Sequence, residues 1–386
     1  MCSSSARSGG APDRTLMNCD LLVVGAGVVG LAHAWAGAKR GWRVVVVERD
    51  AACIGASIRN FGFVTVTGQQ RGAHWRRARR SRDLWAELAP QAGLRIEHAG
   101  LLLAARCVES EALLDAFLAT EMGEGCERVD AAQATARQPG LRGDGLRGAL
   151  VSPHELRVES RDAIPRIAAW LAERHGVEFR FGESVLAVEA PHVRTSRASY
   201  RAERVAVCSG AELHGLFADR WTPHALSLCQ LQMLRVRPPS GFRLNAALMA
   251  DLSLVRYEGY AALPEAQPLL RRLSAERRDA LAHGIHLIAV QSADGTLVVG
   301  DSHHYGPVLP PFASEAVDRL ILDELHRQLA LPSLEVVERW TGVYPVSASA
   351  PCLVEAPDER TRLVMVTSGT GASTAFGLAE EVLAGW

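Results

Sequence analysis

Hydrophobic positions near the N-terminus occur in two short runs on either side of a glycine-rich turn. Residues 20–24 and 44–47 are almost wholly apolar, and residues 28–39 between them follow the alanine-rich pattern of a buried helix. A strand that is apolar throughout, rather than at alternate positions, is typical of a parallel strand covered on both faces. The pattern therefore predicts a β-α-β unit within a doubly wound sheet.

Two more apolar strands are predicted much later in the chain, at residues 204–208 and 363–367. Segments between them alternate apolar and polar positions, as strands of an antiparallel sheet with one more polar face do. These segments are residues 100–105, 226–236, 285–290 and 296–299. The expected fold class is α/β, with one parallel-sheet domain built from separated segments and a second, α+β domain that carries an antiparallel sheet.

The length of 386 residues is sufficient for two domains of unequal size. We assign residues 18–88, 150–222 and 340–386 to the parallel-sheet domain, and residues 89–149 and 223–339 to the second domain, which would bind the substrate. The first 17 residues are rich in Ser, Gly, Ala and Arg and predict a disordered leader.

Charge and cysteine content exclude several classes of function. The chain has 42 basic and 43 acidic residues and a net charge of -1, so no long-range field attracts nucleic acid or an anionic membrane. The basic run at residues 71–82 predicts the solvated face of a helix. The eight cysteines form no CxxC pair or zinc-spaced cluster, which argues against a metal and favours a reducing cytoplasm. No apolar stretch has the length of a membrane span.

A dinucleotide-binding fingerprint occupies the first predicted turn. Gly25, Gly27 and Gly30 have the G-x-G-x-x-G spacing directly after a strand and at the start of a helix. The first glycine permits the tight turn, the second the approach of a pyrophosphate, and the third close helix packing. Glu48, at the end of the next strand, is placed to accept hydrogen bonds from a ribose diol. The first domain is thus predicted to be Rossmann-like.

A second glycine turn, V-T-S-G-T-G at residues 366–371, precedes a small-residue helix at residues 372–383. It directs another helix N-terminus, with its partial positive charge, toward a ligand. A nicotinamide enzyme has no obvious task for this turn, whereas in a flavoprotein such a charge stabilises the reduced flavin ring. FAD is therefore the expected cofactor.

The two glycine turns and the segment V-C-S-G-A at residues 207–211 together resemble the superfamily of glycine oxidase, sarcosine oxidase and D-amino acid oxidase. Residues 57–62, S-I-R-N-F-G, are similar to a turn that runs along the flavin in D-amino acid dehydrogenases of that superfamily. Residues 57–69, 152–166 and 300–306, with the C-terminal tail, most resemble aminophosphonate oxidoreductases of phosphonate breakdown. The resemblance spans nearly the whole chain.

The resemblance implies noncovalent FAD, because no cysteine lies between Trp340 and Tyr344, near the position where sarcosine oxidases of the family attach the flavin. Cys352 is the nearest cysteine that follows. The implied cofactor-binding residues are Gly25, Gly27, Val28, Val29, Glu48, Arg49, Ser57, Asn60, Phe61, Gly62, Phe63, Val185, Ser209, Gly210, Gly369, Thr370, Gly371, Ala372 and Ser373.

The chain departs from the family where the substrate binds. Glycine oxidase-like enzymes bind the substrate carboxylate with the arginine of a Gly-x-Arg-Pro segment, and the matching residues 342–345 are G-V-Y-P, with Tyr344 in place of arginine. Loss of that bidentate contact argues against an ordinary α-amino acid. A phosphonate has three oxygens that several donors can share. The predicted substrate-binding residues are Arg59, Arg256, His303, His304, Arg339 and Tyr344.

These features predict FAD-dependent oxidation of 2-aminoethylphosphonate or its N-methyl derivative to an imine, which hydrolyses to phosphonoacetaldehyde and ammonia or methylamine. His304, Tyr305 and Tyr344 are the catalytic candidates, and oxygen or another acceptor takes the electrons. One alternative keeps the chemistry but takes sarcosine, glycine or another small amine. Another is a catalytically weak flavin-binding partner subunit, which the intact flavin turn and the absence of an added interaction tail argue against.

Overall fold

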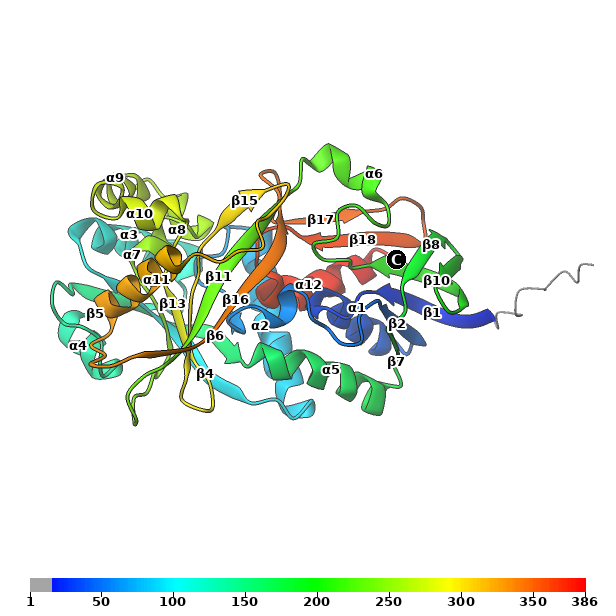
Figure 1. Cartoon of the computed structure of the whole chain (residues 1–386), viewed down its shortest axis with the longest axis horizontal. Coiled ribbons are helices and arrows are strands. Elements are labelled where there is room, and N and C mark those ends of the chain that lie inside the picture. Colours follow the sequence, from blue (N-terminus) through cyan, green and yellow to red (C-terminus); the bar gives the residue numbers. More distant parts are fainter. Residues whose placement is uncertain (1–15) are drawn as a thin grey trace, which may run out of the picture.

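The computed structural model describes residues 16–386, which form two sheets lying side by side (Figure 1). Most of the predicted leader, residues 1–15, lies outside the described residues. Its last two residues, Leu16 and Met17, belong instead to the first strand, β1 (Leu16–Val24), because they pair with Ser199 and Tyr200 of a neighbouring strand. The first domain therefore includes Leu16 and Met17.

The first sheet has eight strands and contains the predicted β-α-β unit. Its main path is β17-β18-β10-β1-β2-β7, and the five strands from β18 to β7 are parallel. β17 pairs antiparallel at one edge, and the hairpin β8-β9 pairs with β10. The bounds are β2 (Val44–Glu48), β7 (Glu178–Phe181), β8 (Val185–Glu189), β9 (His192–Thr195), β10 (Ser199–Val207), β17 (Cys352–Glu355) and β18 (Thr361–Val366).

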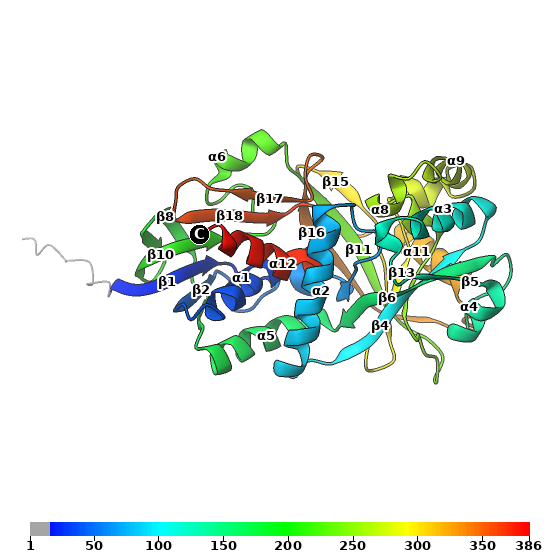
Figure 2. The same cartoon turned by 180° about the vertical axis from the view of Figure 1, so that it is seen from behind.

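Four helices share one hydrophobic core with this sheet: α1 (Val28–Ala38), α2 (Ala73–Gln91), α5 (Ser160–His175) and α12 (Gly371–Ala384). Figure 2 shows α1 and α12 side by side in front of the sheet. The ring of Phe376 on α12 packs edge-on against Trp35 of α1, at 5.5 Å between centroids, and against Trp85 of α2, at 5.0 Å. These contacts fix the start of α12 relative to the start of α1.

The second sheet has ten strands and carries the predicted alternating segments. Its order is β15-β11-β14-β13-β12-β4-β6-β3, with β16 also paired to β11 and β5 to β6. All pairs are antiparallel except β12 with β4, so the expected antiparallel sheet is confirmed apart from that pair. The bounds are β3 (Phe63–Val64), β4 (Ile96–Ala105), β5 (Glu127–Asp130), β6 (Gly148–Val158), β11 (Ser227–Arg237), β12 (Ala247–Met249), β13 (Ile288–Gln291), β14 (Leu297–Gly300), β15 (His304–Gly306) and β16 (Glu335–Val346).

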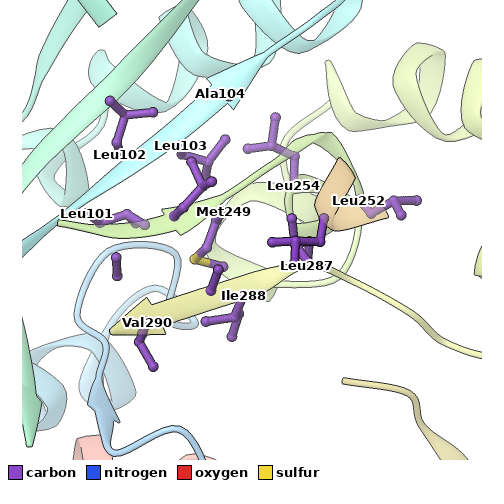
Figure 3. Close-up of a cluster of buried hydrophobic side chains, with 14 of the residues drawn as sticks. Leu101, Leu102, Leu103, Ala104, Met249, Leu252, Leu254, Leu287, Ile288 and Val290 are labelled. Carbon is purple, nitrogen blue, oxygen red and sulfur yellow. The ribbon is translucent and has the colours of Figure 1, made fainter. Parts of the chain in front are cut away.

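Helices of the second domain cover this sheet on the side away from the first domain (Figure 1). The core between them contains Leu101 and Leu103 of β4, Met249 of β12, and Ile288 and Val290 of β13 (Figure 3). The helices are α3 (Val108–Leu118), α4 (Ala131–Arg137), α7 (Asp251–Leu254), α8 (Glu258–Ala261), α9 (Ala266–Glu276), α10 (Arg278–Ala282) and α11 (Glu315–Gln328). The short helix α6 (Ala218–Trp221) and the 3-10 turns η1 (Ala56–Ile58), η2 (Glu121–Gly123) and η3 (Thr222–His224) lie in connections.

Two of the predicted domain boundaries fall inside strands of the second sheet. Residue 150 lies within β6 and residue 340 within β16, so residues 150–158 and 340–346 pair in the second sheet rather than the first. The hydrophobic pattern marks a strand but not its sheet, since both sheets bury apolar positions. Both strands run from the second domain into the interface between the domains, and thus carry residues to the space between the sheets.

The basic run at residues 71–82 lies mainly on α2, as predicted, and most of its arginines bind carboxylates. Arg77 and Arg80 bind Glu381 and Glu380 of α12, and Arg79 binds Glu124. Such exposed or half-buried pairs stabilise the fold by about 0–1 kcal/mol each. Among residues 16–386, no helix combines the length and the apolar character needed to cross a lipid bilayer.

Candidate active site

The two glycine turns meet at one edge of the parallel sheet. β1 and β18 lie on either side of β10 and run parallel to it, so their carboxyl ends reach the same edge. α1 begins at Val28 and α12 at Gly371, directly after the two turns. Two helix N-termini, each with a partial positive charge, therefore open on one cleft.

The first turn has no room for a side chain at its first glycine. Gly25 has φ of 99°, and a Cβ there would lie 2.5 Å from the carbonyl oxygen of Cys208. Glu48 holds the turn from the end of β2, because its Oε2 accepts a hydrogen bond of 2.8 Å from the Ala26 N–H. Arg49 is exposed and pairs with Glu212 at 2.9 Å.

The turn at residues 57–62 packs against the start of α1. The Ser57 hydroxyl accepts a hydrogen bond of 2.9 Å from the Val28 N–H, and Asn60 Oδ1 accepts one of 2.7 Å from the Gly62 N–H. Gly62 does not line the cleft, contrary to the expectation that it binds the cofactor. A Cβ there would lie 1.8 Å from the Val158 carbonyl oxygen, so glycine is needed for packing on β6.

The second glycine turn contacts Tyr344 of β16. Gly369 has φ of 72°, and a Cβ there would lie 2.8 Å from Cζ of Tyr344. The neighbouring Thr370 hydroxyl lies 3.2 Å from Nε2 of His74, a buried residue that also lines the cleft. Burial lowers the pKa of His74 to about 4, so its ring is neutral at pH 7. Sequence reasoning missed His74, because it lies within a run interpreted as solvated.

The cleft between the two sheets has a volume of about 950 Å³, at the upper end of the range for ligand pockets. Apart from Gly62, every predicted cofactor-binding residue lines it. The site residues predicted from three separate parts of the chain therefore share one continuous cavity.

Arg256, Tyr305 and Tyr344 form a polar group toward the second sheet. Tyr305 of β15 and Tyr344 of β16 are both partners of Cys229 in β11, one on each side, so their side chains emerge from the same face. The Arg256 guanidinium donates a hydrogen bond of 3.0 Å to the Tyr305 hydroxyl. All three residues line the cleft.

The charge states of this group follow from its surroundings. Burial lowers the pKa of Arg256, but the nearby Tyr344, Tyr305 and Asp301 more than offset that effect, so the pKa ends above its usual value. Burial, assisted by the neighbouring Cys229, raises the pKa of Tyr344 well above its usual value. The group therefore presents the fixed positive charge of Arg256 and the neutral phenol of Tyr344.

Only two arginines that line the cleft lack a carboxylate partner among residues 16–386. They are Arg59, for which no side-chain partner is found there, and Arg256. Arg339 donates to the Asp318 carboxylate at 2.7 Å, is exposed and does not line the cleft, so the structure does not support its predicted role in substrate binding.

The adjacent histidines 303 and 304 point in different directions. His303 is buried and lines the cleft. His304 lies outside the cleft, with its Nε2 2.9 Å from Nδ1 of His283, so its predicted catalytic and substrate-binding roles are not supported. Successive side chains of an extended segment alternate in direction, and spacing alone does not tell which one faces a site.

His303 lies beside two residues that sequence reasoning did not single out. Asp301 Oδ1 is 3.1 Å from His286 Nε2, and Asp301 Oδ2 is 3.6 Å from His303 Nε2. Burial lowers the pKa of His303 to about 3, so its ring is neutral at pH 7. The expectation of no metal rested on cysteine and histidine spacing, which does not detect side chains that separate strands bring together. The signal present in the sequence is the spacing of Asp301 and His303, two residues apart within segment 300–306.

Residues 20–384 match the family model described as FAD dependent oxidoreductase (DAO). The chain belongs to this family, and it is therefore an FAD-dependent oxidoreductase. No curated protein sequence matches it.

Solved structures share the fold over almost the whole chain at low sequence identity. Glycine oxidase from Geobacillus kaustophilus is 20% identical with a TM-score of 0.74, over 95% of this chain and 94% of that one. L-proline dehydrogenase from P. horikoshii is 18% identical with a TM-score of 0.78, over 95% and 93%. Iminodiacetate oxidase from Chelativorans sp. is 16% identical with a TM-score of 0.69, over 95% and 94%. The expected two-domain α/β fold is thereby confirmed.

The residues of the cleft fit FAD. The bare backbone at Gly25 and Gly27, followed by the α1 N-terminus, is suited to a pyrophosphate, and the Glu48 carboxylate is suited to a ribose diol. Gly371 and the start of α12 would supply positive potential to the flavin ring. FAD supplies the hydride acceptor for the oxidation.

We expect the FAD to be released intact by acid or heat. The cysteines that line the cleft are Cys53 and Cys208, and burial raises the pKa of both thiols, that of Cys53 to about 11. A protonated thiol is a poor nucleophile, so neither is set up to bond the flavin. The measurement is the absorbance of the supernatant after precipitation. Yellow colour that stays with the precipitate contradicts this expectation.

Replacement of Glu48 by alanine should weaken FAD retention. The change removes a charged acceptor, a loss of about 1.5–3 kcal/mol, or roughly tenfold to a hundredfold in dissociation constant. The measurement is fluorescence titration of apoprotein with FAD. Glu178→Ala is the matched control, since Glu178 is exposed at the far end of the neighbouring strand β7. Equal affinities of the two variants would place Glu48 away from the ribose.

Proposed function

We propose that the protein oxidises a small aminophosphonate, 2-aminoethylphosphonate or its N-methyl form, at the carbon beside the amine. The observation that carries this proposal is the distribution of positive charge in the cleft. The family's carboxylate-binding position holds Tyr344. Arg256 lines the same cleft, donates a hydrogen bond to the Tyr305 hydroxyl, and has no carboxylate partner among the described residues. The four sequence segments that resemble aminophosphonate oxidoreductases support the same substrate.

Tyr344 changes what the cleft can bind at that position. An arginine would offer a planar fork of donors to two carboxylate oxygens, whereas a phenol offers one hydroxyl. The contact of Gly369 with the Tyr344 ring fixes the phenol beside the second glycine turn. A substrate anion there would gain one hydrogen bond and no full charge.

Arg256 supplies the charge from another direction. It follows α7, and its hydrogen bond to Tyr305 leaves further N–H donors for an anion in the cleft. A phosphonate is larger than a carboxylate and carries three acceptor oxygens, so Arg256, Tyr305 and Tyr344 can bind it together. Arg59 is a second arginine on the cleft wall without a carboxylate partner among residues 16–386.

The contribution of the chain to the reaction is positioning and exclusion of water. The amine must bind in its neutral form, so that its lone pair assists departure of hydride from the adjacent carbon. The Tyr305 and Tyr344 hydroxyls are the polar groups placed to orient the substrate, and the apolar wall at Phe61 and Leu231 limits water. Oxidation gives an imine, and addition of water gives phosphonoacetaldehyde with ammonia or methylamine.

A carboxylate-bearing amine such as sarcosine or glycine is the competing substrate. Glycine oxidase and iminodiacetate oxidase, whose folds this chain shares, are named for such compounds. On that alternative the Tyr344 hydroxyl bonds the carboxylate that arginine would pair. A catalytically weak flavin-binding partner subunit is the remaining alternative, and it predicts slow turnover with both classes of amine.

The wild type should oxidise 2-aminoethylphosphonate or its N-methyl form with a higher kcat/KM than glycine or sarcosine, by about tenfold or more. Tyr344→Arg should narrow or invert that ratio by about tenfold, because a guanidinium at this position pairs two carboxylate oxygens. Steady-state assays with oxygen and with an artificial electron acceptor measure both ratios. Equal turnover of sarcosine or glycine by the wild type overturns the phosphonate proposal.

Replacement of Arg256 by alanine should lower kcat/KM for the aminophosphonate by about tenfold to a hundredfold, the effect of losing a charge-assisted hydrogen bond. Arg339→Ala is the matched control, because Arg339 binds Asp318 outside the cleft. Unchanged kcat/KM in Arg256→Ala would exclude Arg256 as the anion partner and leave Arg59 to be tested.

A further inference from the structure

Three buried side chains of metal-ligating type meet in the wall of the cleft. His286 precedes β13, Asp301 follows β14, and His303 precedes β15. One ligand atom from each lies within 4.8 Å of the others, and each residue is at most 6% exposed. All three line the cleft, beside Tyr305 and Arg256.

Both imidazole rings present Nε2 toward the carboxylate. His303 Nδ1 lies 2.8 Å from the carbonyl oxygen of Gly284, which can only accept, so Nδ1 carries the hydrogen. His286 Nδ1 lies 3.4 Å from the Ser253 hydroxyl, which donates its own hydrogen to the Leu287 carbonyl. In the neutral rings, both Nε2 atoms are then left with a free lone pair. Metal-binding histidines are commonly oriented by such a bond at the other ring nitrogen.

One oxygen of the Asp301 carboxylate has no well-aligned hydrogen bond. Its Oδ1 is buried and has no hydrogen-bond partner among the described residues, although His286 Nε2 is only 3.1 Å away. Two ligand atoms bonded to one tetrahedral zinc ion at about 2.0–2.2 Å lie roughly 3.3 Å apart. The separations of 3.1 Å from Asp301 Oδ1 to His286 Nε2 and of 3.6 Å from Asp301 Oδ2 to His303 Nε2 are close to that value, so an ion between the rings can be shared by the two carboxylate oxygens.

We propose that His286 Nε2, His303 Nε2 and the Asp301 carboxylate bind a divalent transition-metal ion. Two imidazoles and one carboxylate suit Zn²⁺, Mn²⁺ or Fe²⁺, and three protein ligands leave at least one coordination position open. Because the three residues line the cleft, the open position faces the substrate. Its use by a phosphonate oxygen rests on the proposed function, whereas the binding of the ion does not.

The charges nearby are consistent with such an ion. Asp301 offsets one of its two positive charges, and Arg256 keeps its hydrogen bond to the Tyr305 hydroxyl rather than an ion pair with Asp301. The site with its ion would carry an excess of positive charge, which a doubly charged anion in the cleft neutralises. A phosphonate near pH 7 approaches that charge, as phosphate monoesters do.

Metal binding is measured on the FAD-loaded protein, without substrate and without a histidine tag. After treatment with a chelator and desalting, the protein is titrated by calorimetry with Zn²⁺, and separately with Mn²⁺ and with Fe²⁺ under anaerobic conditions. Metal content after re-dialysis is measured by inductively coupled plasma mass spectrometry. We expect one ion per chain for at least one of these metals.

Variants show whether the ion occupies this site. His303→Ala and the nearly isosteric Asp301→Asn should each weaken binding by about tenfold or more, since even second-layer changes at metal sites cost tenfold to a hundredfold. His304→Ala is the matched control, because the adjacent imidazole lies outside the cleft, and it should bind the metal like the wild type. The flavin absorbance and circular dichroism verify that each variant is folded. If His303→Ala does not fold, the metal affinity of Asp301→Asn alone shows whether the ion occupies this site.

Absence of binding up to millimolar concentrations of all three metals overturns the inference, and so does binding that Asp301→Asn leaves unchanged. Either result leaves the aminophosphonate proposal standing, because that proposal is tested by substrate preference alone. Conversely, if the wild type binds the ion but prefers sarcosine, the metal site is supported, and only the binding of a phosphonate oxygen to the ion is overturned.

Discussion

The close approach of backbone segments at the carboxyl edge of the parallel sheet is the constraint on which the site depends. The Gly25 N–H donates to the Val47 carbonyl at 2.8 Å, and the Cys208 N–H donates to the Val24 carbonyl at 2.9 Å. These bonds leave no space for a Cβ at Gly25 and fix the turn between its neighbouring strands. The N-terminus of α1 is thereby held at the cleft, and the aromatic packing of Phe376 holds that of α12 beside it.

The second sheet places its polar side chains against this edge through a single strand. β11 pairs with β15 on one side and β16 on the other, so Tyr305 and Tyr344 reach the cleft together from opposite sides of Cys229. The contact between Tyr344 and Gly369 joins the second sheet to the second glycine turn. A change at residue 344 therefore alters both the polar wall of the cleft and the surface next to that turn.

The positive charge in the cleft lies on two arginines. Among the described residues, Arg59 and Arg256 are the cleft arginines without a carboxylate partner. The neutral imidazoles of His286 and His303 around Asp301 form a separate polar wall beside Arg256. An anion with several oxygens can contact more of these groups at once than a carboxylate can.

The sequence by itself determined the glycine turns at the edge of the parallel sheet. The G-x-G-x-x-G turn, Glu48 and the second glycine turn are local patterns whose glycines are required by backbone geometry. The residues predicted from these patterns line one cleft, except for Gly62, which packs on β6. Sequence patterning also predicted both sheets, but not that β6 and β16 belong to the second one. Only the tertiary structure decided which of the other predicted side chains reach the cleft. It selected His303 over His304, removed Arg339, and brought His74, His286 and Asp301 to the cleft, because side-chain direction and contacts between distant strands leave no fixed spacing in the chain.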